Sequence, residues 1–151
     1  MQMLWRSQKK LSFKGDNLRT EPLDEAEKLL TYLTVVIGST IIKSYPTPVN
    51  AKVPFTTNTS VIIRFTDDKR KASNCIPMFR IITYSVRDIN KCKEFDDLVK
   101  LAVHECCHFI YTGHKKEYWI NYYIWYEAAK KCFGEYISED GINELQGMAG
   151  S

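Results

Sequence analysis

The sequence lacks any apolar run long enough to cross a bilayer. The longest, residues 33–42, is interrupted at Thr34 and at Gly38, and it falls well short of the roughly 20 apolar residues of a transmembrane helix. The first ten residues, MQMLWRSQKK, contain no apolar stretch of signal-peptide length. We therefore expect no secretory signal and no membrane partner.

A disulfide framework is also missing. The chain has five cysteines, an odd number, and their spacing follows no pattern of small disulfide-rich domains. Reduced thiols are typical of the cytosol, so we expect a cytoplasmic, reducing compartment. Cys106 and Cys107 are neighbours in a predicted helix and point to different sides, which makes them poor partners for one another.

Neither sign of charge dominates the composition. The net charge is +3, and 44% hydrophobic with 26% charged residues is typical of one globular domain, here residues 1–151. A nucleic-acid-binding domain usually carries a denser cationic stripe, so contact with nucleic acid is permitted but not indicated. We expect the basic groups at 69–71 and 115–116 to be solvated surface charges.

The pattern of hydrophobic residues predicts a mixed α+β fold. Residues 1–21 form an N-terminal arm that can include a short extended piece, and helical spacing predicts a helix over 22–44 with Pro22 in its first turn. Alternation predicts strands at 51–56, 60–66 and 78–86, which form a small antiparallel or mixed three-stranded sheet. Residues 67–77 read as a polar loop.

Two further helices follow the predicted sheet. The first runs from 95 to about 112, with Gly113 placed to end it in a left-handed turn. The second covers about 117–133 and is followed by a flexible tail at 135–151. Its predicted buried face consists of Tyr118, Tyr122, Trp125, Ala129 and Cys132.

All three histidines of the chain lie within eleven residues, HECCHFIYTGH. A helix places residues four apart on one face, so His104 and His108 can bind one metal ion with Glu105 beside them. His114 follows Gly113 closely enough to reach back as a third ligand. Three protein ligands with one free position are typical of catalytic zinc, so the sequence predicts a Zn²⁺ site.

Glu105 is the candidate catalytic residue. Zinc lowers the pKa of its bound water, and a neighbouring carboxylate can take the proton and pass it to a leaving amine. This chemistry predicts hydrolysis of a peptide bond. A tyrosine hydroxyl often helps to hold the oxyanion, and the sequence offers four candidates without choosing among them: Tyr111, Tyr118, Tyr122 and Tyr126.

The thiols of Cys106 and Cys107 are open to two interpretations. They could be zinc ligands, but each is offset by about 100° or more around an ideal helix from at least one of the ligand histidines. We favour the alternative, in which they are small buried side chains that pack the helix.

Residues 104–127, HECCHFIYTGHKKEYWINYYIWYE, resemble the SprT-like and WLM-type minimal zincin metalloproteases. In the WLM pattern an H-E-x-x-H is followed by five residues, a His, three residues and an aromatic pair, here Tyr118-Trp119. The resemblance implies a zincin-like fold, with His104, His108 and His114 as zinc ligands and Glu105 as the catalytic acid and base. It also implies the element order helix, small sheet, motif helix, further helix.

The expected partner is a protein or peptide substrate, bound as an added strand along a sheet edge such as residues 78–86. Two alternatives stay open. One is a zincin-like protein in which zinc serves structure or interaction without turnover, and the other is a nucleic-acid-binding module that uses the basic loop and exposed aromatics. A water in the fourth zinc position would indicate catalysis, and a protein side chain there would indicate a structural role.

Overall fold

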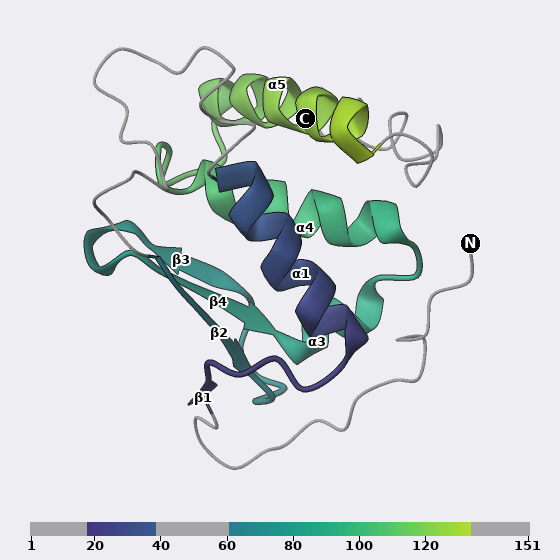
Figure 1. Cartoon of the computed structure of the whole chain (residues 1–151). Helices are drawn as coiled ribbons and strands as arrows, with labels where there is room; N and C mark the ends of the chain where they lie inside the picture. The colour runs from purple at the N-terminus through teal and green to yellow at the C-terminus, as the bar shows by residue number, and fades with distance from the viewer. Residues whose placement is uncertain (1–17, 39–60, 134–151) are drawn as a thin grey trace.

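The computed structural model describes residues 18–38 and 61–133. Over these ranges the chain is α+β, with four α-helices and a four-stranded sheet (Figure 1). The elements are, in chain order, β1 (Leu18–Arg19), α1 (Glu25–Val36), β2 (Ile62–Thr66), β3 (Asn74–Ile76), the 3₁₀ turn η3 (Pro77–Phe79), β4 (Ile81–Ser85), α3 (Val86–Lys91), α4 (Phe95–Cys107) and α5 (Lys116–Phe133).

The sheet is mixed, with the strand order β1-β2-β4-β3. β2 and β4 are parallel, while β1 pairs with β2 and β3 pairs with β4 in antiparallel fashion. The side chains of Phe65, Ile82 and Tyr84 are fully buried against the helices. Among the described strands, β4 lies between β2 and β3 and is an interior strand, and β3 forms one edge of the sheet.

The helices lie in two layers beside the sheet (Figure 1). α1 packs against α4, and α5 packs against α4 on the side away from the sheet. The hydroxyl groups of Thr34 and Tyr84 lie 2.6 Å apart and join α1 to β4. One hydrophobic core thus runs from the sheet through α1 and α4 to α5, and it surrounds the histidine helix with apolar side chains.

The first helix begins later than the sequence pattern predicted. Asp24 is the N-cap, because its side chain accepts a hydrogen bond from the backbone N–H of Glu27, and Pro22 therefore precedes the helix. The buried carboxylate of Glu27 accepts two hydrogen bonds from Arg19, which ties β1 to α1. The predicted end of this helix at residue 44 and the predicted strand at 51–56 lie outside the described residues.

The region between β2 and α4 also differs from the prediction. The loop expected at 67–77 contains β3, and the strand expected at 78–86 is shortened to β4 because Arg80 adopts the left-handed conformation, with φ 56°, directly before it. Val86 begins α3, which the sequence analysis missed. Ser85 caps this helix by accepting a hydrogen bond from the N–H of Arg87.

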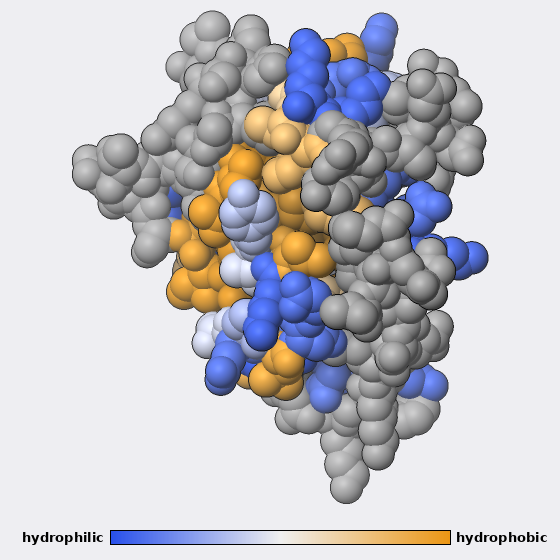
Figure 2. Space-filling model, turned by 45° about the vertical axis from the view of Figure 1, so that its right-hand side comes forward, coloured by the Kyte–Doolittle hydropathy of each residue, from blue (hydrophilic) through white to orange (hydrophobic). Residues whose placement is uncertain are grey.

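The exposed surface is partly apolar. The face in Figure 2 shows apolar residues in its middle, with hydrophilic residues in separate groups around them. Exposed large hydrophobic side chains include Tyr32 on α1, Met78 and Phe79 in the turn after β3, and Ile120 on α5. Among the described helices, none combines the length and apolar character that crossing a membrane requires.

Candidate metal centre

α4 carries the first half of the histidine motif. A capping box starts the helix, in which the side chain of Asp97 accepts hydrogen bonds from the backbone of Lys93 and Glu94. The helix ends at Cys107, not at 112 as predicted, because the N–H groups of residues 108 to 110 bond to carbonyls three residues back. His108 is the C-cap. Gly113 does not adopt a left-handed conformation, so that prediction was also wrong.

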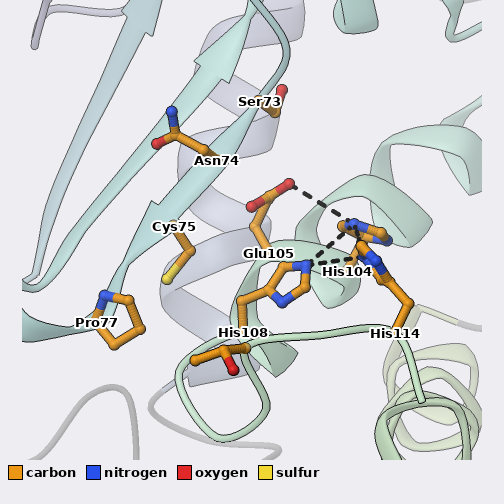
Figure 3. A pocket seen from close by; sticks show the side chains of 9 residues that line it. Ser73, Asn74, Cys75, Pro77, His104, Glu105, His108 and His114 are labelled. Carbon is orange, nitrogen blue, oxygen red and sulfur yellow. Dashed lines mark hydrogen bonds and ion pairs between the residues drawn. The ribbon is translucent and has the colours of Figure 1, made fainter. Parts of the chain in front are cut away.

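The three histidine rings converge on one point (Figure 3). The Nε2 atom of His108 lies 3.4 Å from that of His104 and 3.1 Å from that of His114, and the third Nε2–Nε2 distance is 3.2 Å. Tetrahedral zinc with Zn–N bonds of about 2.0–2.1 Å separates two nitrogen ligands by about 3.3 Å. These residues could therefore hold a metal ion, and their spacing fits zinc.

The protonation of the rings suits metal binding as well. Nδ1 of His108 lies 2.8 Å from the carbonyl oxygen of Tyr111, so this nitrogen carries the proton and donates it, which leaves a lone pair on Nε2. Burial and, to a smaller extent, the two neighbouring histidines lower the pKa of His104 to about 4. The pKa of His108 is lowered mainly by burial. Neutral imidazoles are the form that binds metal ions.

Glu105 lies beside the histidine cluster. Its Oε1 atom is 4.0 Å from Nε2 of His104, and its buried Oε2 atom has no hydrogen-bond partner among the described residues. Burial, together with the smaller effect of the Asp88 carboxylate, raises the pKa of this carboxyl to about 8. A buried carboxylate oxygen normally accepts a hydrogen bond or lies near a cation, and this oxygen has neither partner among the described residues. A metal ion in the histidine cluster would supply the positive charge, and water bound to the ion would supply the hydrogen-bond donor.

The cluster opens into a cleft of about 250 Å³. One wall consists of His104, Glu105, His108, Thr112 and His114, and the opposite wall consists of Ser73, Asn74, Cys75 and Pro77, in and next to β3 (Figure 3). Burial raises the pKa of the Cys75 thiol to about 12, so it is a protonated, weak ligand at neutral pH. Sequence reasoning missed this second wall, because a three-residue edge strand carries no distinctive pattern.

Three of the four tyrosines considered as oxyanion donors are engaged elsewhere. Three tyrosines of α5, spaced four residues apart, have hydroxyl groups that bond to α4: Tyr118 to the carbonyl oxygen of His104 (2.9 Å), Tyr122 to that of Lys100 (3.4 Å) and Tyr126 to the carboxylate of Asp96. We call these three residues the tyrosine ladder. Tyr111 lines a separate cavity of about 380 Å³. None of the four lines the metal cleft.

The cysteines bear out the packing interpretation. Cys106 and Cys107 are fully buried, and all five thiols are free. The predicted face of α5 is also buried, except for Cys132, which is exposed because it lies in the last turn of the described helix. Among the described residues, the only group of three or more potential ligands is the histidine triplet, so no cysteine or carboxylate completes a fourth ligand position.

In the loop that contains the basic residues 69–71, one of the positive charges forms an ion pair within the loop. The guanidinium group of Arg70 pairs with Asp68 at 2.9 Å, and it holds the pKa of this carboxyl at about 2 through hydrogen bonds and charge. Part of the positive charge at 69–71 is therefore balanced within the loop itself.

Comparisons with known proteins add no relative to this picture. No family model matches the sequence, and neither a curated protein nor a solved structure matches it. The resemblance to minimal zincins therefore depends on residues 104–127 and on the geometry described above.

Proposed function

We propose that this protein is a zinc-dependent metallopeptidase with a zincin-like fold. One observation carries the proposal: three Nε2 atoms converge at zinc-ligand spacing on a cleft that also contains the unpartnered, buried oxygen of Glu105. A structural zinc site closes its coordination with a fourth protein ligand. The described residues offer no such ligand, and this favours catalysis over a purely structural metal.

Each residue of the cluster has a definite task in this reaction. His104, His108 and His114 hold the ion, and zinc when bound polarises the scissile carbonyl and acidifies the attacking water. Glu105 takes a proton from that water as the new C–O bond forms. It then delivers the proton to the amine nitrogen as the C–N bond breaks.

The substrate binds along β3 in this proposal. We predicted strand addition at residues 78–86, but β4 lies between β2 and β3 and has no free edge. β3 is at the edge of the sheet, and its residues form the wall of the cleft that faces the histidines. An extended peptide that pairs with β3 would therefore pass in front of Glu105.

The test is a comparison of Glu105→Gln with the wild type on an unfolded protein substrate such as casein. We expect the variant to retain its zinc and to lose about 10²–10⁴-fold in turnover, because the amide cannot take a proton. Glu117→Gln, a matched change at an exposed position in the first turn of α5, should behave as the wild type. Equal turnover by Glu105→Gln and the wild type would refute the assignment. A zinc-loaded wild type without turnover would instead support the structural alternative.

A further inference from the structure

The three histidines are supported unequally. A metal-binding histidine usually donates its second ring N–H to a carbonyl or carboxylate, which fixes the ring orientation. His108 does so, toward Tyr111. His114 lies in an exposed segment, residues 112–117, and apart from the Nε2 atoms of the other two histidines its ring has no hydrogen-bonding partner among the described residues. Another contact must therefore orient the third ligand.

Two aromatic rings from the start of α5 lie against the ligand rings. Tyr118 stacks on His108, with ring centroids 4.9 Å apart and an angle of 28° between the planes. The next residue, Trp119, stacks on His114 at 6.0 Å and 29°. Tyr118 also meets the ring of His114 edge-on at 4.9 Å. Adjacent residues thus each present a flat face to one of the two ligands that lie outside α4.

The two aromatic residues are themselves held in place. Tyr118 is buried, and its hydroxyl bonds to the carbonyl oxygen of His104. In a regular helix the backbone N–H of His108 would donate to the carbonyl oxygen of His104, but here it donates to that of Glu105. The hydroxyl of Tyr118 therefore supplies the hydrogen bond that the His104 carbonyl would otherwise receive from the helix. The indole of Trp119 packs edge-on against Tyr122 at 5.3 Å. The support for His114 therefore extends through the tyrosine ladder to α4.

We propose that Trp119 is a positioning residue, whose indole face orients His114 for the metal ion in place of a hydrogen bond from the second ring nitrogen. An exposed imidazole without such a support samples several rotamers, and the ion must select the productive one. Stacking on a large ring that packs on the protein body reduces this freedom before the ion arrives. This proposal rests on the three-histidine metal site of the proposed function.

The test is the zinc affinity of the full chain, measured by competition with a chromophoric chelator after removal of bound metal. The variants are Trp119→Phe, which keeps an aromatic face, and Trp119→Leu, which keeps apolar volume but has no ring. Loss of a group that orients a metal ligand typically weakens metal affinity about 10- to 100-fold. We expect a loss in that range for Trp119→Leu and a loss of less than a few-fold for Trp119→Phe. Ile120→Ala, at the exposed next position of the same helix, should bind as the wild type.

The fluorescence of the Trp119 indole provides a second measurement. Co²⁺ bound to the histidines should quench the fluorescence of Trp119, whose ring stacks on His114, and Trp119→Phe should lose this metal-dependent quenching while it still binds the ion. Trp125, which is fully buried in the core, reports whether the variant remains folded. Quenching that is as strong in Trp119→Phe as in the wild type would contradict the placement of Trp119.

The outcomes separate the two proposals. If the wild type binds no zinc, the proposed function fails and this inference fails with it. If the wild type binds zinc and Trp119→Leu binds it equally well while folded, only the positioning role is refuted. Equal losses in Trp119→Leu and Trp119→Phe would also refute it, because an aromatic face would then make no difference.

Discussion

The helical wall of the cleft is formed by α4 and residues 108–114, and aromatic rings of α5 stack on two of its histidines. His108 donates a hydrogen bond to the backbone carbonyl of Tyr111 and stacks on Tyr118, and the tyrosine ladder bonds α5 to α4 at three successive turns. The strand wall, residues 73–77, is held mainly by backbone pairing of β3 with β4. Its side chain beside Glu105 is a small neutral thiol, Cys75.

Because of this difference, we expect the strand wall to tolerate substitutions better than the helical wall. Ligands must keep their geometry within a few tenths of an ångström to bind an ion, so they need side-chain support. A substrate-binding strand offers mainly backbone groups, which most residue types provide equally. We therefore expect changes at the histidines and at the residues that contact them to affect metal binding and stability, and changes on the strand wall to affect turnover alone.

The largest effect is expected for His108→Ala. The variant loses the ligand in the middle of the cluster, so zinc affinity should fall by more than 100-fold. Since the ion binds only the folded state, zinc at 100 times its Kd stabilises the wild type by about 2.7 kcal/mol, and this gain should vanish in the variant. Thermal unfolding with and without a chelator measures it. Thr112→Ala, which changes a cleft residue that is no ligand, should keep the full gain.

A bulky residue on the strand wall should separate turnover from metal binding. Cys75→Phe places a ring into the cleft near Glu105, and displacement of the substrate by about 1 Å can reduce turnover about 10²-fold. Zinc content should stay at the wild-type level. Cys75→Ala should remain active, since the thiol has no assigned step. A loss of zinc in Cys75→Phe would show that the two walls are not independent.

Removal of one rung of the tyrosine ladder should destabilise the helical wall. Tyr126→Phe leaves the buried carboxylate of Asp96 without its hydroxyl donor, which should lower the free energy of unfolding by about 1–3 kcal/mol. Urea denaturation of the metal-free protein provides the measurement. Tyr123→Phe is the matched control, because this tyrosine is only partly buried on the same helix. A similar loss in both variants would argue against a specific contribution of the ladder.

The smallest effect concerns the loop that leads to the strand wall. Arg70 holds the pKa of Asp68 at about 2, below the ordinary value of 3.8, so their interaction stabilises the fold above about pH 4. This stabilisation is lost as the pH falls through about 2. The stability difference between the wild type and Arg70→Ala should therefore be full at pH 5 and shrink between pH 4 and pH 2. Lys131→Ala, an exposed cation on α5, should show no such pH dependence.

The residues of the candidate metal site could be identified from the sequence alone. His104, Glu105 and His108 are set by spacing within about one helical turn, and His114 by a connection too short to carry it far away. Local spacing is enough here because a helix fixes neighbours three and four residues apart without help from distant segments. The α+β class and the helix at 117–133 follow from hydrophobic periodicity for the same reason, and the described α5 confirms that helix.

The strand β3 opposite the histidines and the tyrosine ladder behind them could not be predicted from the sequence, because both depend on tertiary packing. The edge position of β3 depends on which strand pairs with which, and a run of three residues contains no information about pairing. The tyrosine ladder was visible as a repeat of four residues, but its bonds to α4 exist only because α5 packs antiparallel on that helix at one register. Interactions between segments far apart in the chain depend on packing, and packing is a property of the whole core.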